Sequence, residues 1–466
     1  MNALVTAPPQ TAAPIPLNFH PRRVKTRLYG DQVFVVDRLS GRWLFAPAEK
    51  APSIRQVTDA EHGTRFSGDG EKWVSILSHE GIGADVPEKN FDALRMLILK
   101  LTDACHLRCT VCYSYEDLSK ARVLDETQAR NAIEQSLELC PDILQVLLHG
   151  GEPLLVWPLI ERLVEFAENT AARLGKRVEF TGQSSFTRLT DRIVDFSREH
   201  QIRWGLSLDG DAGINDQIRV DHKGRGTYHQ VMQALHTWPT FVRAAGVMAT
   251  ITRVNAHRLL DVARHIRSLD FTGFDWSLFQ PIGRARHRPE FGIDTAVLAA
   301  SWKGLFEAVL SGEFDGFTVQ PVKKYIDQFF FGATANMCLR PKCGAGRDLM
   351  SLSANGTIEA CDCIDPTRAD ISDLGNARDT SIGQARQSVK AQNIRARDMS
   401  EAPDCSTCPW YSMCGGTCLA YASTLDDKSP LYCAMSKSNY DAIAAEVAGS
   451  GDRIIRYLAS LECRPS

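Results

Sequence analysis

Between residues 94 and 320, short apolar segments alternate with amphipathic ones, and this alternation limits the possible folds more than any other feature. The pattern predicts six strands, at 96–101, 143–148, 177–181, 203–207, 246–252 and 274–280. It predicts helices between them, at 125–139, 156–174, 191–200, 227–237 and 256–269, the first capped by Asp125. Elements in this order form a parallel sheet with right-handed crossovers. Six strands fall short of a complete eight-stranded barrel.

Three cysteines follow the first predicted strand in a C-x3-C-x2-C spacing: Cys105, Cys109 and Cys112. A 4Fe-4S cluster takes four ligands, normally thiolates, so three closely spaced cysteines would leave one iron open to a small molecule. The cysteines lie on the loop that leaves the C-terminal end of the strand, which is the catalytic face of βα-barrels. A zinc site or unconnected structural cysteines are the alternatives.

This motif resembles the signature of the radical S-adenosylmethionine (SAM) enzymes. In that family the open iron binds the amino and carboxylate groups of SAM, and reductive cleavage gives a 5′-deoxyadenosyl radical. The resemblance implies a partial (β/α)6 radical SAM barrel, in agreement with the six predicted strands. The family usually has an aromatic residue before the third cysteine, where this chain has Val111. Tyr113 is the candidate to take over its packing role near adenine.

Further motifs at the strand ends resemble the family's cofactor contacts. The segment Gly150-Gly151-Glu152 matches the family's GGEP motif, which binds the methionine amino group. Glycines also let a ligand approach the backbone closely, although a simple Gly-Gly turn is the alternative. Ser185 stands where many relatives have asparagine, and its hydroxyl can still hydrogen-bond a ribose or a carboxylate.

Three residues at the end of the fourth strand and beyond it complete the predicted cofactor site. Ser207 and Asp209 belong to a common family motif and would face the cofactor, although Asp209 is also a typical turn residue before Gly210. Arg219 matches a family arginine that can pair with the methionine carboxylate through its guanidinium fork. The alternative for Arg219 is a surface salt bridge.

Eight more cysteines form a second field whose spacing resembles the SPASM pattern of radical enzymes that modify peptides and proteins. Eight thiolates are what two fully ligated 4Fe-4S clusters require. The resemblance implies a first auxiliary cluster held by Cys338, Cys343, Cys361 and Cys418. It implies a second held by Cys405, Cys408, Cys414 and Cys433. A pair of structural zinc sites is the alternative, and Cys140, Cys363 and Cys463 are left over.

Asp362 directly follows a predicted ligand of the first auxiliary cluster. A substrate radical often must lose a proton and an electron, and a carboxylate beside an electron acceptor can take the proton. In the maturases that this chain resembles, an aspartate at the matching position lies near the substrate. The alternative is that Asp362 caps a turn or hydrogen-bonds backbone amides.

Composition limits the partners and the compartment. The net charge of −3 provides no bulk polycation for nucleic acid or an anionic membrane. No apolar run reaches the ~20 residues that span a bilayer, and the N-terminus has no secretory signal. Fourteen cysteines without an export signal favour cluster binding in a reducing cytoplasm over disulfides.

The chain divides into six predicted segments. They are a disordered lead-in (1–23), an N-terminal α+β module (24–92), the barrel (94–320), a bridge (321–337), the SPASM domain (338–436) and a helical segment (437–466). In the N-terminal module, 32–36 and 42–45 indicate a β-hairpin and 71–77 a short helix. In peptide-modifying family members such an extension is often winged-helix-like and captures a leader peptide as an added strand. A cap without a binding role is the alternative.

Together these features favour a maturase that uses three 4Fe-4S clusters and SAM to install a cross-link, thioether or carbon–carbon, or to epimerise a residue in a ribosomally made peptide. An external electron donor such as flavodoxin or ferredoxin would supply the electron. A sulfatase-maturase-like enzyme is the second interpretation, although such enzymes usually begin their radical motif near the N-terminus. The third is an electron-transfer or zinc-stabilised interaction protein, which leaves the Gly150–Glu152 motif unexplained.

Overall fold

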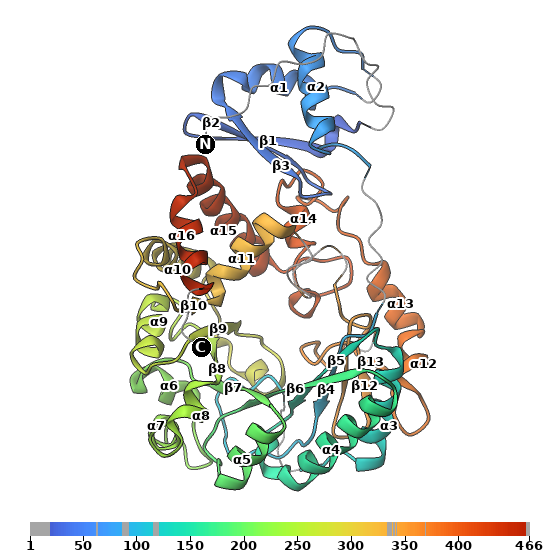
Figure 1. Ribbon diagram of the computed structural model, residues 1–466, viewed down its shortest axis with the longest axis vertical. Helices are drawn as coiled ribbons and strands as arrows, with labels where there is room; N and C mark the ends of the chain where they lie inside the picture. The colour runs from blue at the N-terminus through green and yellow to red at the C-terminus, as the bar shows by residue number, and fades with distance from the viewer. Residues whose placement is uncertain are drawn as a thin grey trace.

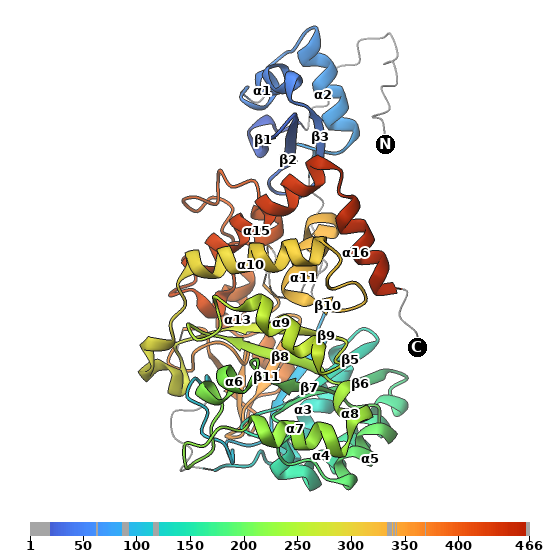
Figure 2. The same ribbon diagram turned by 90° about the vertical axis from the view of Figure 1, so that its left-hand side faces the viewer.

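The computed structural model describes residues 19–61, 64–85, 93–114, 121–332, 338, 341, 343–368 and 370–462. Figure 1 shows the N-terminal module at one end of the elongated molecule and the barrel at the other. Helices from the C-terminal part of the chain lie between the two in both Figure 1 and Figure 2.

The barrel sheet has the predicted six parallel strands in chain order. They are β4 (Met96–Lys100), β5 (Ile143–His149), β6 (Arg177–Ser184), β7 (Arg203–Ser207), β8 (Gly246–Ile251) and β9 (Gly273–Leu278). Each pairs in parallel with the next, and their apolar side chains form the main core. The α/β fold class with a mostly parallel sheet is therefore confirmed. A short strand, β10 (Thr318–Val319), adds to the β9 edge.

The predicted helices are also present around this sheet. They are α3 (Glu126–Leu139), α4 (Trp157–Arg173), α5 (Asp191–Glu199), α7 (Tyr228–Thr237) and α9 (Leu259–Ser268). Asp125 caps α3 as predicted, accepting a hydrogen bond from the Gln128 amide at 3.0 Å. The pattern missed four helices: α6 (Ala212–Ile218), α8 (Pro239–Arg243), α10 (Thr295–Leu310) and α11 (Gln320–Phe331). In α10 the cause is burial on several faces, which leaves no clear polar stripe.

The sheet continues past the barrel into the cysteine-rich part of the chain. Strand β11 (Leu349–Leu352) pairs in parallel with β4, and β12 (Thr357–Glu359) and β13 (Asp373–Asn376) follow in antiparallel order. Ten strands therefore share one sheet, in the order β10-β9-β8-β7-β6-β5-β4-β11-β12-β13. This pairing brings the segment after β12, which contains Cys361 and Asp362, next to the barrel.

The N-terminal module is a three-stranded antiparallel sheet with two helices. The elements are η1 (Pro21–Arg23), β1 (Val24–Tyr29), β2 (Gln32–Asp37), β3 (Trp43–Pro47), α1 (Ala51–Thr58) and α2 (Asp69–His79). The predicted hairpin is β2–β3, whereas β1 and α1 were not predicted. Disorder was expected up to residue 23, but this is wrong for residues 19–23, because Phe19 is buried in the module's own core and Pro21–Arg23 form η1. Residues 1–18 lie outside the described residues.

An aromatic cluster joins this module to the rest of the protein. The Phe34 ring stacks on Phe329 of α11 and on Trp410, with centroids 5.8 and 5.4 Å apart. The Trp43 indole nitrogen donates to the Phe329 carbonyl at 3.0 Å. The contacts fix one face of the module sheet against α11 and the cysteine-rich region.

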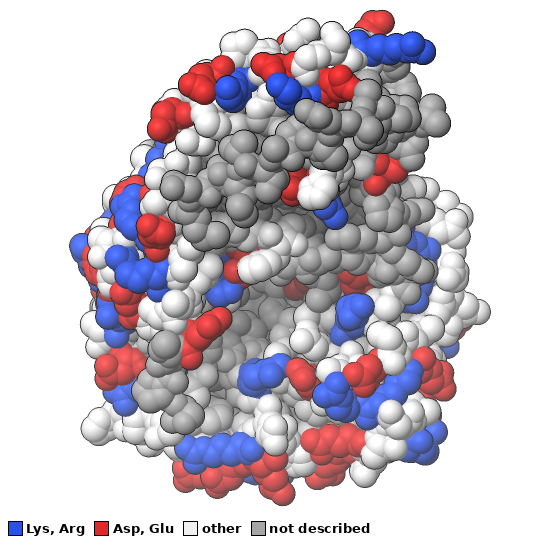
Figure 3. All heavy atoms as spheres, turned by 45° about the horizontal axis from the view of Figure 1, so that its top comes forward, with Lys and Arg blue, Asp and Glu red and all other residues white. Residues whose placement is uncertain are grey.

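Two helices, α15 (Pro430–Gly449) and α16 (Asp452–Glu462), end the described chain. Helical structure was predicted from residue 437, but α15 begins at Pro430 and so contains Cys433. The Tyr440 hydroxyl donates to Gln328 of α11 at 3.2 Å, so α15 packs on the helices beside the barrel. Within the described part of the chain, no helix combines the length and apolarity needed to cross a bilayer. On the face in Figure 3, acidic and basic side chains are interspersed.

Candidate active site

The cysteine loop after β4 is held by backbone hydrogen bonds on two sides. On one side the Gly151 amide donates to the Thr102 carbonyl at 2.7 Å, and the Glu152 amide donates to the Ala104 carbonyl at 2.9 Å. On the other side the amides of residues 108 and 110 donate to the carbonyls of residues 220 and 218 at 2.7 and 2.8 Å. The segment after β5 and the segment after α6 therefore help β4 to position the three cysteines of the loop, Cys105, Cys109 and Cys112.

The two glycines of the predicted SAM motif have a structural reason for being glycines. Gly150 has a φ of +131°, and a Cβ there would lie 2.7 Å from the Thr102 carbonyl oxygen. A Cβ on Gly151 would collide with the Ala104 carbonyl. The sequence suggested that the glycines leave room for a ligand. In the structure they allow two backbone segments to approach each other closely.

Glu152 is a buried carboxylate that no cation neutralises within the described residues. It accepts hydrogen bonds from the Ser184 hydroxyl at 2.7 Å and from the Ser185 hydroxyl and amide at 2.6 and 3.1 Å. Burial, followed by the charge of Glu152, raises the pKa of Cys105 well above its usual value. A buried carboxylate without a counter-charge is costly, so this position favours a positively charged ligand group.

Asp209 and Arg219 form a buried ion pair beside the cysteine loop. An Arg219 Nη donates to Asp209 Oδ1 at 2.9 Å, and the Thr250 amide donates to the same oxygen at 2.7 Å. The side chain of Arg219 is 14% exposed and that of Asp209 is 0% exposed, which is inconsistent with the surface salt bridge considered for Arg219. Burial raises the pKa of Cys109 to about 11, while the Arg219 guanidinium opposes this shift. Arg219 therefore lies close enough to the cysteine loop to influence it.

The remaining predicted SAM contacts lie at neighbouring strand ends. Ser207, at the end of β7, accepts a hydrogen bond from the Gln183 side chain at 2.8 Å. Ser185 is buried against Glu152 and also contacts the Thr187 hydroxyl at 3.0 Å. The polar groups of β6 and β7 therefore face the same region as the cysteine loop.

Tyr113 connects the cysteine loop to the cysteine-rich region. Its hydroxyl donates to Asp362 Oδ2 at 3.1 Å and lies 3.4 Å from His149 Nε2. Burial, followed by the charge of Asp362, raises the pKa of Tyr113 well above its usual value, so the phenol stays protonated and donates. The hydroxyl therefore points at Asp362, and the predicted packing on adenine stays a prediction.

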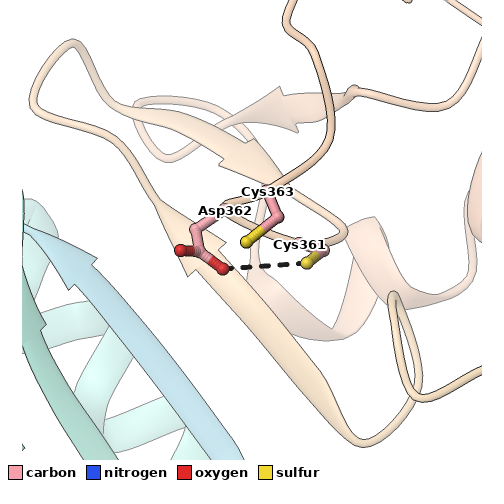
Figure 4. Close-up of side chains that lie close together, drawn as sticks. All are labelled: Cys361, Asp362 and Cys363. Atoms are coloured by element: carbon pink, nitrogen blue, oxygen red, sulfur yellow. Dashed lines mark hydrogen bonds between the residues drawn. The ribbon is translucent and has the colours of Figure 1, made fainter. Parts of the chain in front are cut away.

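Asp362 lies between two cysteines whose thiols face it. Figure 4 shows its carboxylate beside Cys361, whose Sγ is 3.7 Å from Asp362 Oδ1. The ligand atoms of Cys361, Asp362 and Cys363 all lie within 4.8 Å of one another. Cys363, which the sequence left without a role, is therefore part of this cluster.

Three residues without a role in the sequence analysis line the same buried region: Lys100, His149 and Glu359. Lys100 Nζ pairs with Glu359 Oε2 at 2.8 Å, and both side chains are buried. Burial lowers the pKa of Lys100, but Glu359 and then Asp362 outweigh it and raise the value. Burial lowers the pKa of His149, whose buried Nδ1 atom has no hydrogen-bond partner among the residues that the structure describes. A lysine ending an otherwise apolar strand was the signal that could have revealed this network.

The cysteines of the first predicted auxiliary set interact with one another. Burial raises the pKa of Cys418 to about 12, and Cys343 and Cys361 add to the shift. Cys338 is exposed as a residue, but local burial of its thiol, followed by Cys418, Cys343 and Cys361, raises its pKa well above the usual value. These neighbouring thiols disfavour each other's ionisation. The positive charge of the metal ions in a bound cluster would stabilise them as thiolates.

The cysteines of the second predicted set line one cavity. Its walls include Cys405, Cys408, Cys414, Cys433, Lys428 and Lys437. Burial raises the pKa of Cys414 to about 11, whereas Lys428 opposes the rise at Cys405. Four thiols and two cations around one cavity suit a bound group with net negative charge.

Two protein-family models match this chain in the regions just described. The Radical SAM superfamily model matches residues 99–266, and the SPASM iron-sulfur cluster-binding domain matches residues 343–409. The chain therefore belongs to the radical SAM superfamily and carries a SPASM domain. Membership implies a 4Fe-4S cluster and SAM as cofactors.

Relatives include enzymes that mature sulfatases. The serine-type anaerobic sulfatase-maturating enzyme of Bacteroides thetaiotaomicron is 26% identical over 357 residues, which cover 70% of this chain and 82% of the relative. An uncharacterised protein of Methanocaldococcus jannaschii is also 26% identical, over 190 residues. That match covers 41% of this chain and 64% of the length of the Methanocaldococcus protein.

Two kinds of solved structure share the fold. The structure of anSMEcpe with bound AdoMet has a TM-score of 0.67 at 18% identity and covers 77% of this chain and 99% of that one. SuiB of Streptococcus suis bound to the precursor peptide SuiA has a TM-score of 0.54 at 13% identity and covers 89% and 99%. At these identities the similarity establishes the fold alone.

Proposed function

We propose that this protein is a radical SAM/SPASM maturase that modifies a ribosomally made peptide, installing a thioether or carbon–carbon cross-link or a related change such as epimerisation. The observation that carries the proposal is the hydrogen bond from Tyr113 to Asp362. It joins the loop of the radical motif to the loop of an auxiliary-cluster motif, although the residues are 249 positions apart in sequence. Substrate activation and removal of a proton can therefore occur in one enclosed region.

In this proposal three 4Fe-4S clusters are bound, one by Cys105, Cys109 and Cys112 and two by the auxiliary sets. With SAM bound and one electron supplied by an external donor, the first cluster would provide the radical chemistry that removes hydrogen from the substrate. The residues fit this assignment because three thiols share one short loop, while the second auxiliary set surrounds a single cavity.

Glu152 is proposed to bind the amino group of SAM. Support comes from its burial and from the lack of any cation at ion-pair distance within the described chain. Ser184 and Ser185 hold both carboxylate oxygens by hydrogen bonds, so an ammonium group would meet an oriented acceptor. Gly150 and Gly151 hold this motif against the cysteine loop.

The polar residues at the ends of β6 and β7 and after α6 are proposed to bind the rest of SAM. Arg219 already pairs with Asp209, so a carboxylate ligand would share the guanidinium with it. Ser207 and Ser185 would offer hydroxyl groups to the ribose or the carboxylate. Tyr113 remains the aromatic candidate beside adenine.

Asp362 is proposed as the base that accepts the substrate proton. Tyr113 donates to Asp362 Oδ2 and so orients the carboxylate. The alternative is that Asp362 is structural, holding Tyr113 and the Cys361 loop in place. Asp362→Asn keeps the shape and removes the base, so we expect continued 5′-deoxyadenosine formation with most product lost. Full product yield from an iron-replete variant would assign Asp362 the structural role.

The N-terminal module is proposed to capture the peptide's leader by strand addition. Strand β1 lies beside α15, where Tyr29 donates to Asp441 at 3.0 Å. Strand β3 pairs with β2 alone among the described strands, so its other edge is available for an added strand. Deleting the module would uncover Phe329 and Trp410, so the intact protein should be tested with leaderless peptide. We expect the leaderless peptide to bind more weakly; equal affinity would exclude leader capture.

Oxidation of a residue in a protein substrate is the second candidate, and the names of several relatives describe maturation of sulfatases. Their sequence similarity favours it. The SuiB match covers 89% of this chain against 77% for the anSMEcpe match, and this larger shared fold favours the peptide maturase. Sulfatase-derived and precursor peptides, assayed side by side by mass spectrometry, distinguish the two candidates.

The test of the overall proposal is 5′-deoxyadenosine formation by anaerobically reconstituted protein. Replacing Cys105, Cys109 and Cys112 with alanine should remove four irons and abolish this product, because alanine offers no ligand. Retained cleavage in that variant would exclude the catalytic assignment. Zinc in place of iron at the C-terminal cysteines would exclude the auxiliary clusters and favour the zinc-stabilised alternative.

A further inference from the structure

A group of basic side chains surrounds the outer side of the cysteine loop, and the proposed chemistry does not use them. We name it the loop-face patch. It consists of five exposed residues: Arg108, Arg188, His222, Lys223 and Arg225. The protein as a whole carries a net charge of −3, so a concentration of positive charge here is a local feature.

Several contacts place the patch directly on the cysteine loop. The segment around Asp221 forms a bridge with Leu107, and the His222 ring lies 3.1 Å from the Cys105 carbonyl oxygen. His106 lies between the patch residues: burial, followed by Arg188 and His222, lowers its pKa to about 4. The exposed His222 ring therefore contacts the backbone of Cys105 directly.

The positive charge of the patch is only partly neutralised. Asp221 pairs with Arg225 at 2.7 Å and also accepts the Lys223 amide at 2.8 Å, so it is committed to its own turn. Within the described residues, no ion pair forms at Arg108, Arg188 or Lys223. Among the described residues, therefore, at least three positive charges of the patch are not used in ion pairs.

A hollow opens beside these charges. It has a volume of about 470 Å³, and its lining includes His106, Phe186, Arg188, Arg225 and Trp238. Arginine and aromatic side chains are enriched in protein–protein interfaces. A recess of this composition can receive a projecting part of a partner protein.

We infer that the loop-face patch is the docking surface for a small acidic one-electron carrier protein. This rests on the proposed function, since reductive cleavage of each SAM consumes one electron. The carrier loses that electron and the cluster held by the cysteine loop gains it, while no atom is transferred. Electron transfer slows steeply with distance, so a carrier must approach where the loop is nearest the surface. Opposite charges at that place accelerate encounter and fix its orientation.

The test uses the double variant Arg188→Glu/Lys223→Glu, which reverses two charges without touching the cysteine loop itself. The matched control is Arg55→Glu/Lys303→Glu, which makes the same charge change at exposed positions on α1 and α10. Binding of a reduced acidic flavodoxin is measured as Kd at low and high salt. 5′-Deoxyadenosine formation is measured with that carrier and with excess dithionite.

We expect the double variant to bind flavodoxin roughly 10-fold or more weakly at low salt, with a smaller difference at high salt. Its activity with dithionite and its iron content should match those of the control. Wild-type affinity in the double variant, or an equal loss in the control, would overturn the docking assignment. Failure of the proposed function would instead appear as wild-type protein that yields no 5′-deoxyadenosine with dithionite, whatever its flavodoxin affinity.

Discussion

Replacing Glu152 by glutamine is the sharpest test of the proposed SAM contact, because it removes one charge and almost no volume. Glu152 is 2% exposed, and its two oxygens accept from Ser184 and Ser185. If the SAM ammonium binds here, its hydrogen bond joins two charged groups, which is worth about 1.5–3 kcal/mol. At about 1.4 kcal/mol per factor of ten, SAM should bind roughly 10- to 150-fold more weakly to the variant.

The same substitution has opposing effects on folding. Loss of the buried charge removes the free-energy cost of desolvating a carboxylate. In the wild-type protein, however, the backbone amides of Leu154 and Ser185 each donate to one Glu152 oxygen, and the NH2 group of a glutamine would face one of these two donors. A backbone donor left without its acceptor costs about 1–3 kcal/mol, so the two effects largely offset each other. We therefore expect a folded variant whose SAM affinity falls without a matching fall in stability.

Equilibrium SAM binding to anaerobically reconstituted protein is the assay, with iron content and melting temperature measured on the same samples. Glu165→Gln, at an exposed position on α4, is the matched control for the lost charge. Unchanged affinity in an iron-replete Glu152→Gln variant would refute the ammonium contact. An equal loss of affinity in the control would attribute the effect to net charge.

Three further outcomes are expected. Lys100→Met should destabilise the protein by about 3–5 kcal/mol, because it leaves Glu359 buried without its partner. Adding Glu359→Gln to the same chain should restore part of the lost stability; if melting temperatures of the two single variants and the double variant show additive effects, this prediction is wrong. Anaerobic iron analysis should find about twelve irons in the intact protein and about eight after Cys433→Ala; an unchanged count would remove Cys433 from the ligands. A precursor without its leader should also be modified more slowly; an unchanged rate would argue against a role for residues 24–92.

The sequence alone determined those features that depend on neighbours along the chain. Six strands and five helices were predictable because hydrophobic periodicity is a local property, and Asp125 was recognisable as a cap for the same reason. The cysteine spacings and the Gly150–Glu152 motif are also local. The Radical SAM model matches the region of the first cysteine motif and of Gly150–Glu152, and the SPASM model matches residues 343–409, which hold part of the second cysteine field. Helix α10 escaped prediction because packing on several sides removed its polar stripe.

Tertiary structure decided which distant residues meet. Strand β11 joins β4 through pairs such as Leu349 with Met96, and no local pattern specifies a partner some 250 residues away. The contact of Tyr113 with Asp362 follows from long-range packing, as does the ion pair of Lys100 with Glu359. Hydrophobic patterns specify that a strand is buried but not which strand lies beside it, because backbone hydrogen bonds are alike in every pairing. The chemistry of the predicted site therefore depends on side chains that only the folded chain brings together.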